Sequence, residues 1–173
     1  EVVGSITTDK PKIKSLSVVV PAYNEASRIG ATLERLGAYL QEEVETPELL
    51  VVDDGSSDKT VEVVESYKDQ IPFLQIIELD PNRGKGGAVC AGVMASTQDM
   101  VLFSDADLST PIEDVVLLLN ALDEKTPIAI GSRGLKESRL EIRQPFYREM
   151  MGRTFNRIVR MLLGITIRDT QCG

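Results

Sequence analysis

Short apolar runs alternate with segments of helical periodicity along most of the chain. The runs cover residues 16–20, 48–53, 74–79, 100–104 and 128–130, and most are continuous rather than alternating. Continuous aliphatic runs are typical of strands that are covered on both faces. Helix-like spacing fills residues 27–43, 59–67, 85–96 and 111–122. This alternation predicts an α/β fold with a mostly parallel sheet and helices on both faces.

The start of the last predicted helix fixes one junction. Thr110 is a suitable N-cap, Pro111 suits the first helical position, and Glu113 stands three residues after the cap. Residues 105–109 must therefore connect a strand end to a helix start. Because open α/β sheets bind ligands beyond the carboxyl ends of their strands, we expect a site there.

Composition limits the chain to one domain of ordinary polarity. Its 173 residues are 42% hydrophobic and 27% charged, which suits one sizeable core. The net charge of -8 argues against general nucleic-acid binding. Residues 133–168 nevertheless carry nine Lys or Arg and three Asp or Glu, a local +6, so the remainder carries -14. This basic segment is predicted to be a separate functional surface.

The chain contains no histidine, and its two cysteines, Cys90 and Cys172, lack metal-ligand spacing. Ser-His and Cys-His nucleophile pairs and the commonest zinc ligands are therefore excluded. Both cysteines are expected to be thiols in a reducing compartment. We also find neither an apolar run long enough to span a membrane nor a signal-peptide core at the start of the sequence.

Two acidic motifs follow the first two predicted strands, at residues 21–25 (P-A-Y-N-E) and 53–57 (D-D-G-S-S). A carboxylate at a strand tip can accept a hydrogen bond from a base or a ribose hydroxyl, and Tyr23 can pack against either. The alternative is turn chemistry, in which Ser56 or Ser57 caps the next helix.

Two further motifs suit a diphosphate. Residues 82–88 (N-R-G-K-G-G-A) form a glycine-rich turn into a helix, where backbone amides favour phosphate, although a tight turn also explains the glycines. Asp105 and Asp107 follow an apolar strand and could share Mg²⁺ or Mn²⁺. The alternative for this pair is a solvated turn or a helix cap.

In their order, these motifs and G-S-R at residues 131–133 resemble the family 2 glycosyltransferases of GT-A type, over residues 16–173. The N-R-G-K-G-G-A motif and the closing residues 167–173 are most similar to dolichyl-phosphate glucosyltransferases, with the mannosyltransferases as near relatives. The resemblance implies one Rossmann-like glycosyltransferase domain, with a nucleotide-sugar part at 12–132 and an acceptor part at 133–173. It also implies that the natural protein continues beyond residue 173.

The resemblance assigns roles by matching position. The donor-binding residues it implies are Pro21, Tyr23, Glu25, Val52, Asp54, Lys85, Asp105, Ala106 and Asp107. Asp105 and Asp107 are the implied metal ligands, for Mg²⁺ or Mn²⁺, and they are implied to be catalytic together with Arg133. Ser109 stands where the mannosyltransferases often have glutamine, so the resemblance supplies no third protein ligand.

The basic segment is predicted to contain a helix over residues 145–163 with an apolar stripe and a separate arginine-rich face. Such a helix can lie in a bilayer interface or pack on a core with its basic face solvated. The resemblance favours the first, and Arg133, Arg148 and Arg153 are the predicted acceptor-binding residues because guanidinium groups suit phosphate.

The implied reaction is inverting transfer of a hexose to a polyprenyl or dolichyl phosphate by an enzyme peripheral to the cytoplasmic face of a membrane. UDP-glucose is the preferred donor and GDP-mannose the second. Two alternatives stand beside it, a receiver-like signalling domain and a non-catalytic nucleotide-sugar or lipid-binding module. The first gives no role to Asp105, Asp107 or the arginines.

Overall fold

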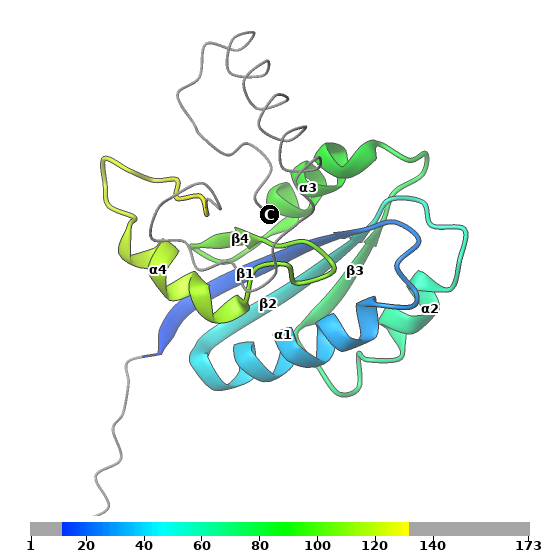
Figure 1. Cartoon of the computed structure of the whole chain (residues 1–173), viewed down its shortest axis with the longest axis horizontal. Helices are drawn as coiled ribbons and strands as arrows, with labels where there is room; N and C mark the ends of the chain where they lie inside the picture. The colour runs from blue at the N-terminus through cyan, green and yellow to red at the C-terminus, as the bar shows by residue number, and fades with distance from the viewer. Residues whose placement is uncertain (1–11, 132–173) are drawn as a thin grey trace, which may run out of the picture. The chain divides into compact units, whose positions relative to one another are not determined.

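The computed structural model describes residues 12–131, and the chain divides into two compact units, residues 1–113 and 114–173. A parallel sheet of four strands organises the first unit (Figure 1). The strands are β1 (Ile13–Ala22), β2 (Val44–Asp53), β3 (Leu74–Glu78) and β4 (Val101–Phe103), and their order is β3-β2-β1-β4. The predicted parallel α/β fold is thereby confirmed.

Helices cover both faces of this sheet. Helices α1 (Ile29–Glu43) and α2 (Thr60–Glu65) lie on one face, and α3 (Gly84–Ala95) lies on the other (Figure 1). Because successive residues of a strand point to opposite faces, a strand between two helical layers must be apolar on both. This explains why Val18, Val19 and Val20 of β1 are all fully buried.

The packing of α3 on the sheet is especially close. Ala88 of α3 forms a buried cluster with Val19, Leu50, Val52 and Leu79. At Gly92 an added Cβ would lie 2.3 Å from a methyl carbon of Val19, so any larger residue would push the helix off the sheet. Close contact here fixes α3, which the glycine-rich turn enters, relative to β1 and β2.

A buried carboxylate ties the amino end of the sheet together. Glu48 of β2 is 4% exposed and accepts hydrogen bonds from the hydroxyl of Ser17, from the backbone N of Thr97 at 2.9 Å and from the Thr97 hydroxyl at 2.8 Å. Burial alone raises the pKa of Glu48, but these donors outweigh it and hold the pKa below its usual value. The connection from α3 to β4 is thus attached to β1 and β2.

Two sequence predictions differ from the structure. Residues 128–130 form no strand, because this short run stays open to solvent, with Ile128 77% and Ile130 51% exposed. The predicted helix at 111–122 is a 3-10 turn, η1 (Ile112–Asp114), followed by the six-residue α4 (Val115–Asn120). Glu113 pairs with Arg35 at 3.0 Å, which engages the side chain that was expected to complete the cap.

Two remaining expectations concern thiols and membranes. Cys90 is an exposed free thiol, whereas Cys172 lies outside the described residues. Between residues 12 and 131, no helix has the length and apolar character that a membrane span requires. The predicted division into parts at 12–132 and 133–173 stays a prediction.

Candidate active site

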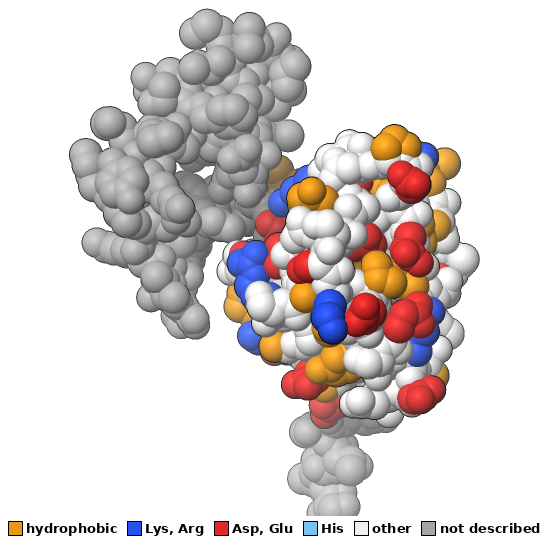
Figure 2. All heavy atoms as spheres, turned by 90° about the vertical axis from the view of Figure 1, so that its right-hand side faces the viewer, with side chains coloured by type: hydrophobic (Ala, Val, Ile, Leu, Met, Phe, Trp, Pro, Cys, Tyr) orange, Lys and Arg blue, Asp and Glu red, His pale blue; other side chains and the backbone are white. Residues whose placement is uncertain are grey.

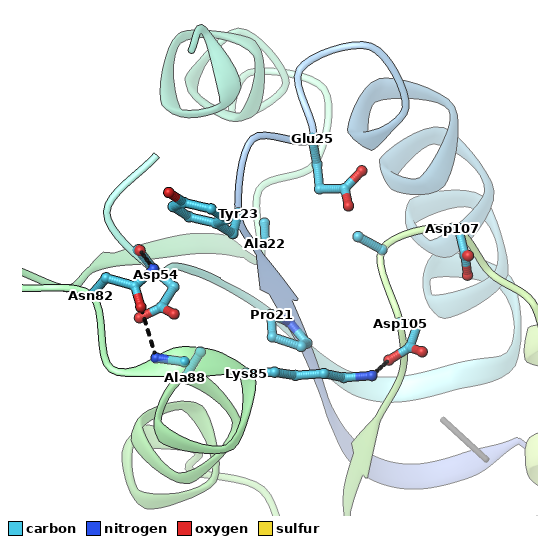
Figure 3. A pocket seen from close by; sticks show the side chains of 12 residues that line it. Pro21, Ala22, Tyr23, Glu25, Asp54, Asn82, Lys85, Ala88, Asp105 and Asp107 are labelled. Carbon is cyan, nitrogen blue, oxygen red and sulfur yellow. Dashed lines mark hydrogen bonds and ion pairs between the residues drawn. The ribbon is translucent and has the colours of Figure 1, made fainter. Parts of the chain in front are cut away.

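A cleft of about 420 Å³ opens at the carboxyl end of the sheet, within the size range of small-molecule sites. The chain places β2 and β3 on one side of β1 and β4 on the other, so the strand order reverses between β1 and β4. Open α/β sheets bind ligands at such a switch point. The residues that line the cleft are Pro21, Ala22, Tyr23, Glu25, Asp54, Asn82, Gly84, Lys85, Ala88, Asp105, Ala106 and Asp107 (Figure 3).

Hydrogen bonds fasten the loop after β1 to the loop after β2. The side-chain oxygen of Asn24 accepts from the backbone N of Ser57 at 2.9 Å and of Asp58 at 3.3 Å. The backbone N of Asn24 donates to the hydroxyl of Ser56 at 2.9 Å. Asn24 has φ 55°, a conformation that asparagine tolerates better than most residues. The result is a fixed backbone on either side of Asn24.

This fixed loop presents Tyr23 and Glu25 to the cleft. Tyr23 is 52% exposed, so its ring is free to stack on a planar group. The backbone N of Glu25 donates to the hydroxyl of Thr60 at 2.8 Å, and both carboxylate oxygens accept from Arg28 at 2.7 and 2.8 Å. A ligand that hydrogen-bonds to Glu25 therefore meets a carboxylate already neutralised by an arginine.

The end of β2 supplies two buried carboxylates. Asp54 is 3% exposed, and its Oδ1 accepts from the backbone N of Arg83 at 2.7 Å, while its backbone O accepts from the side chain of Asn82 at 2.7 Å. Asp53 is 2% exposed and accepts from the backbone N of Ser56 at 2.9 Å. Asp54 thus both lines the cleft and fixes the glycine-rich turn beside it (Figure 3).

The loop after β4 is held by one contact from α1 and one local turn. Thr32 of α1 donates its hydroxyl to the backbone O of Ala106 at 2.5 Å, and both groups are buried. Oδ1 of Asp107 accepts from the hydroxyl of Ser109 at 2.6 Å and from its backbone N at 3.0 Å. The Ser109 hydroxyl, more than any other group, lowers the pKa of Asp107, which therefore stays ionised well below neutral pH.

Lys85 crosses the cleft from α3 to this loop. Gly84 begins α3 with φ 74° and its backbone N donates to the side-chain oxygen of Asn82 at 3.0 Å. From the next position, Nζ of Lys85 reaches Oδ1 of Asp105 at 2.6 Å (Figure 3). An ammonium and a carboxylate from distant parts of the sequence therefore meet inside the cleft.

The residues present fit a hard divalent cation. Oδ1 of Asp105 is a buried atom that receives the Lys85 ammonium but no directed hydrogen bond from the described residues. Asp107 offers a second ionised carboxylate, and carboxylate oxygens are ligands for Mg²⁺ and Mn²⁺. Residues 12–131 contain no cluster of three His, Cys, Asp or Glu side chains able to bind a metal. Phosphate oxygens and water would have to complete the coordination.

Figure 2 shows the end of the sheet that carries the loops after β1 and β2. Acidic side chains are spread over this face with basic side chains among them. A nucleoside diphosphate is itself an anion, so it would need these cations, a metal or both to approach.

The structure brings together eight of the nine predicted donor-binding residues. The cleft includes Pro21, Tyr23, Glu25, Asp54, Lys85, Asp105, Ala106 and Asp107. Val52 is absent from its walls, because its side chain is fully buried beneath α3. Arg133, Arg148 and Arg153 lie outside the described residues, as does the predicted helix at 145–163.

Sequence reasoning assigned no role to Asn24, Thr32 or Asn82. Asn24 lies inside a recognised motif, and its tolerance of positive φ was a usable signal. Thr32 was detectable as a polar residue on the apolar face of a predicted helix. The hydrogen bonds of Asn82 depend on how the glycine-rich turn packs against Asp54, which no local pattern encodes.

The comparison with protein families decides which family this arrangement represents. The model of glycosyl transferase family 2 matches residues 17–172. The chain belongs to glycosyl transferase family 2. The fold of this family 2 chain is of GT-A type, as the resemblance implied.

Curated relatives are similar in sequence to this chain along nearly its whole length. Proteins of Drosophila melanogaster and Homo sapiens, both named dolichyl-phosphate beta-glucosyltransferase, are 39% and 37% identical to it. The matches cover 95% and 92% of this chain and 54% and 53% of the relatives. The family 2 chain therefore spans about half the length of the curated relatives it matches.

Solved structures with similar folds contain nucleotide sugars. A mannosyltransferase from Pyrobaculum calidifontis in complex with GDP-Man and Mn²⁺ is 30% identical, with a TM-score of 0.50 over 58% of this chain and 30% of that chain. S. aureus TarS 1-349 in complex with UDP-GlcNAc is 28% identical, also with a TM-score of 0.50, over 62% of this chain and 31% of that chain.

Proposed function

We propose that this family 2 chain transfers glucose from UDP-glucose to dolichyl phosphate or a similar polyprenyl phosphate. The observation that carries the proposal is the cleft, which gathers an exposed tyrosine, a buried carboxylate, a lysine and the Asp105–Asp107 pair at one end of the sheet. Relatives named dolichyl-phosphate beta-glucosyltransferase, similar over more than nine tenths of the chain, support the choice of substrates.

The nucleoside would lie between the loops after β1 and β2. Tyr23 would stack on the uracil or the ribose, and Asp54 would accept a hydrogen bond from the base. Because the hydrogen bonds of Asn24 hold the loop after β1 in place, this loop loses little conformational entropy when the nucleotide binds. Preorganisation of this kind favours a specific pose.

The diphosphate would lie toward Lys85 and the loop after β4. Asp105 and Asp107 would hold Mg²⁺ or Mn²⁺, which supplies neutralisation of the charge that develops on the departing nucleoside diphosphate. Lys85 offers an ammonium to the same oxygens, and the backbone amides at the start of α3 add partial positive charge. The cations of this wall thus match the charge of the leaving group.

The acceptor phosphate suits a chain without histidine. A lipid monophosphate is largely ionised near pH 7, with a second pKa of about 6, so its oxygen can attack without a general base. The bond from the anomeric carbon to the lipid phosphate oxygen forms on one face as the bond to the UDP oxygen breaks on the other. The configuration therefore inverts, and the products are the glucosyl phospholipid and UDP.

Arg133, Arg148 and Arg153 are the proposed acceptor ligands, in a basic segment suited to an anionic membrane surface. On this proposal the chain acts at the cytoplasmic face of a membrane as a peripheral protein. The acceptor is embedded in that membrane through its polyprenyl tail.

GDP-mannose is the second candidate donor. The Pyrobaculum mannosyltransferase, solved with GDP-Man and Mn²⁺, is 30% identical to this chain, which favours keeping a guanine nucleotide as an option. Asp54 could accept a hydrogen bond from guanine as well as from uracil, so the cleft alone does not select the base.

A turnover assay with the purified chain separates these options. UDP-glucose or GDP-mannose is supplied with Mn²⁺ and a short polyprenyl phosphate, and release of the nucleoside diphosphate is followed with and without the lipid. We expect lipid-dependent release from UDP-glucose. Faster release from GDP-mannose would assign the mannosyl reaction instead, and nucleotide binding without lipid-dependent release would indicate a non-catalytic binding module.

A further inference from the structure

Lys85 lies where a divalent cation is expected to bind. Its Nζ is 2.6 Å from Oδ1 of Asp105, and it also lies 5.6 Å from the centre of the Phe103 ring. Both partners stand on the same short stretch of chain, at the end of β4 and just after it. Figure 3 shows the lysine extended across the cleft toward this carboxylate.

The two partners differ in how firmly they are placed. The Asp105 side chain is 24% exposed, and its Oδ1 is buried, so its position is set by the loop after β4. The Lys85 side chain is 58% exposed and consists of a flexible four-carbon stem that ends in a single charge. Lys85 can therefore leave Asp105 at the small cost expected for a partly exposed ion pair.

We propose that Lys85 acts as an internal counter-ion that occupies Asp105 until a divalent cation displaces it, and that the released ammonium then binds the diphosphate. The proposal rests on the proposed function for the identity of the diphosphate. An ammonium and a divalent cation bound to the same carboxylate repel each other, so a metal that binds Asp105 would weaken the contact between Lys85 and Oδ1. The higher charge of the metal decides the competition once it is present.

This exchange would couple metal binding to nucleotide binding. Without metal, Lys85 is held by Asp105 and the aromatic ring, so it is less available to phosphate oxygens. With metal, the same ammonium is freed beside the metal-bound diphosphate. Each ligand then increases the affinity for the other, as linkage requires.

The proposed role of Lys85 predicts opposite changes in the affinities for Mn²⁺ and for UDP when the lysine is replaced. Replacing Lys85 by Met removes the competitor, so Mn²⁺ alone should bind about twofold to fivefold more tightly, the range expected for losing one partly exposed ion pair. The same change removes a phosphate ligand, so UDP in the presence of Mn²⁺ should bind about tenfold more weakly. If Lys85 had only a structural role, its replacement would change the affinities for Mn²⁺ and for UDP in the same direction, or it would change neither of them.

The experiment is calorimetric titration of MnCl₂ into the 173-residue chain without nucleotide, followed by UDP with saturating Mn²⁺. The variants are Lys85→Met, Lys85→Arg, which keeps the charge, and Asp105→Asn, which removes the disputed carboxylate. Lys68→Met is the matched control, because Lys68 forms an exposed ion pair with Glu65 outside the cleft. Circular dichroism confirms that each variant is folded.

We expect tighter Mn²⁺ binding only in Lys85→Met, wild-type Mn²⁺ affinity in Lys85→Arg and Lys68→Met, and weaker binding in Asp105→Asn. If Lys85→Met does not fold, Lys85→Gln replaces it with the same expectation. Unchanged or weaker Mn²⁺ binding in the neutral variant overturns the counter-ion role. Because this titration contains no nucleotide, failure of the wild type to bind UDP would count against the proposed function and leave the test of Lys85 intact.

Discussion

The two ends of the parallel sheet both contain buried carboxylates, but they use them differently. At the amino end, Glu48 accepts three hydrogen bonds from Ser17 and Thr97, so both of its oxygens are satisfied. At the carboxyl end, the buried Oδ1 of Asp53 lacks a hydrogen-bond partner among the described residues, and the buried Oδ1 of Asp105 receives the Lys85 ammonium in an ion pair but no further hydrogen bond from them. A satisfied carboxylate contributes to stability, whereas an incompletely satisfied one retains capacity for a ligand.

The carboxyl end is itself divided. The wall formed by the loops after β1 and β2 is fixed by hydrogen bonds that involve Asn24 and Thr60. The opposite wall, after β4, meets α3 through an ion pair whose lysine is exposed. We interpret the first wall as a preorganised nucleoside site and the second as the part that adjusts when diphosphate and metal enter.

The largest expected effect belongs to Asp107→Asn. Losing one metal ligand should remove about 4 kcal/mol of transition-state stabilisation, which is roughly a thousandfold in turnover. The thermal midpoint should change little, because Asp107 is exposed and its partner Ser109 lies in the same turn. The control is Ser109→Ala, which keeps the carboxylate and should lose far less activity. Near-normal Mn²⁺-dependent turnover of Asp107→Asn would remove this residue from the metal site.

A smaller effect, on stability alone, is expected for Glu48→Gln. The amide nitrogen replaces one of the two oxygens that accept from Ser17 and Thr97, so the free energy of unfolding should fall by about 2 kcal/mol. Urea unfolding measures it, with the exposed Glu45→Gln as the control. Nucleotide affinity of the folded variant should equal that of the wild type. A loss of affinity without a loss of stability would contradict the division between the two ends.

The stability that Glu48 contributes should depend on pH, and comparison with the same variant measures this dependence. Because the pKa of Glu48 is lowered in the folded protein, its stabilisation is complete above the unfolded-state pKa and is lost as the pH falls through the folded-state pKa. The stability difference between wild type and Glu48→Gln should therefore be constant near neutrality and shrink in acid. A difference that grows toward low pH would show that the sign of the shift is wrong.

Asp54→Ala should weaken UDP binding about tenfold, or about 1.4 kcal/mol, because it removes the proposed acceptor for the base. It also releases the backbone N of Arg83, so part of the loss would come from the glycine-rich turn. Asp54→Asn retains an oxygen for Arg83 and isolates the contact with the nucleoside. Unchanged calorimetric affinity of both variants for UDP and for GDP would reduce Asp54 to a turn residue.

The smallest effect is expected for Asn24→Gly. Glycine tolerates the φ of 55° but removes the side-chain oxygen that binds Ser57 and Asp58, so the loop loses hydrogen bonds without gaining strain. UDP affinity should fall about threefold, at a cost of roughly 0.7 kcal/mol. Asn24→Ala adds backbone strain and should bind more weakly still. Equal affinities for the three proteins would show that the fixed wall does not depend on Asn24.

Much of the fold was predictable, because buried parallel strands are encoded by continuous apolar runs such as that around Val18 to Val20. The strand predicted at residues 128–130 was wrong because three apolar residues carry no information about whether a partner strand exists. The helix predicted at 111–122 begins as the 3-10 turn η1 and ends at Asn120, and Glu113, which matched a capping pattern, instead pairs with Arg35.

The site, like the fold, could be predicted only in part. Acidic residues at strand ends could be assigned to one cleft because parallel strands end at a common edge. The burial of Val52 and the reach of Lys85 to Asp105 could not, since both depend on how α3 packs on the sheet at Gly92. Local patterns identified most of the residues that line the cleft, and tertiary packing determined which of them touch each other.

Calorimetric titration of UDP-glucose into the chain, with Mn²⁺ and then with EDTA, tests the central claim most directly. We predict saturable binding at one site, and Mn²⁺ should strengthen this binding. Asp54→Ala should weaken it, Asp107→Asn should remove its dependence on Mn²⁺, and Glu48→Gln should leave it unchanged. Absence of binding, or binding that Glu48→Gln weakens as strongly as Asp54→Ala does, would contradict the assignment of the nucleotide-sugar site to the carboxyl end of the sheet.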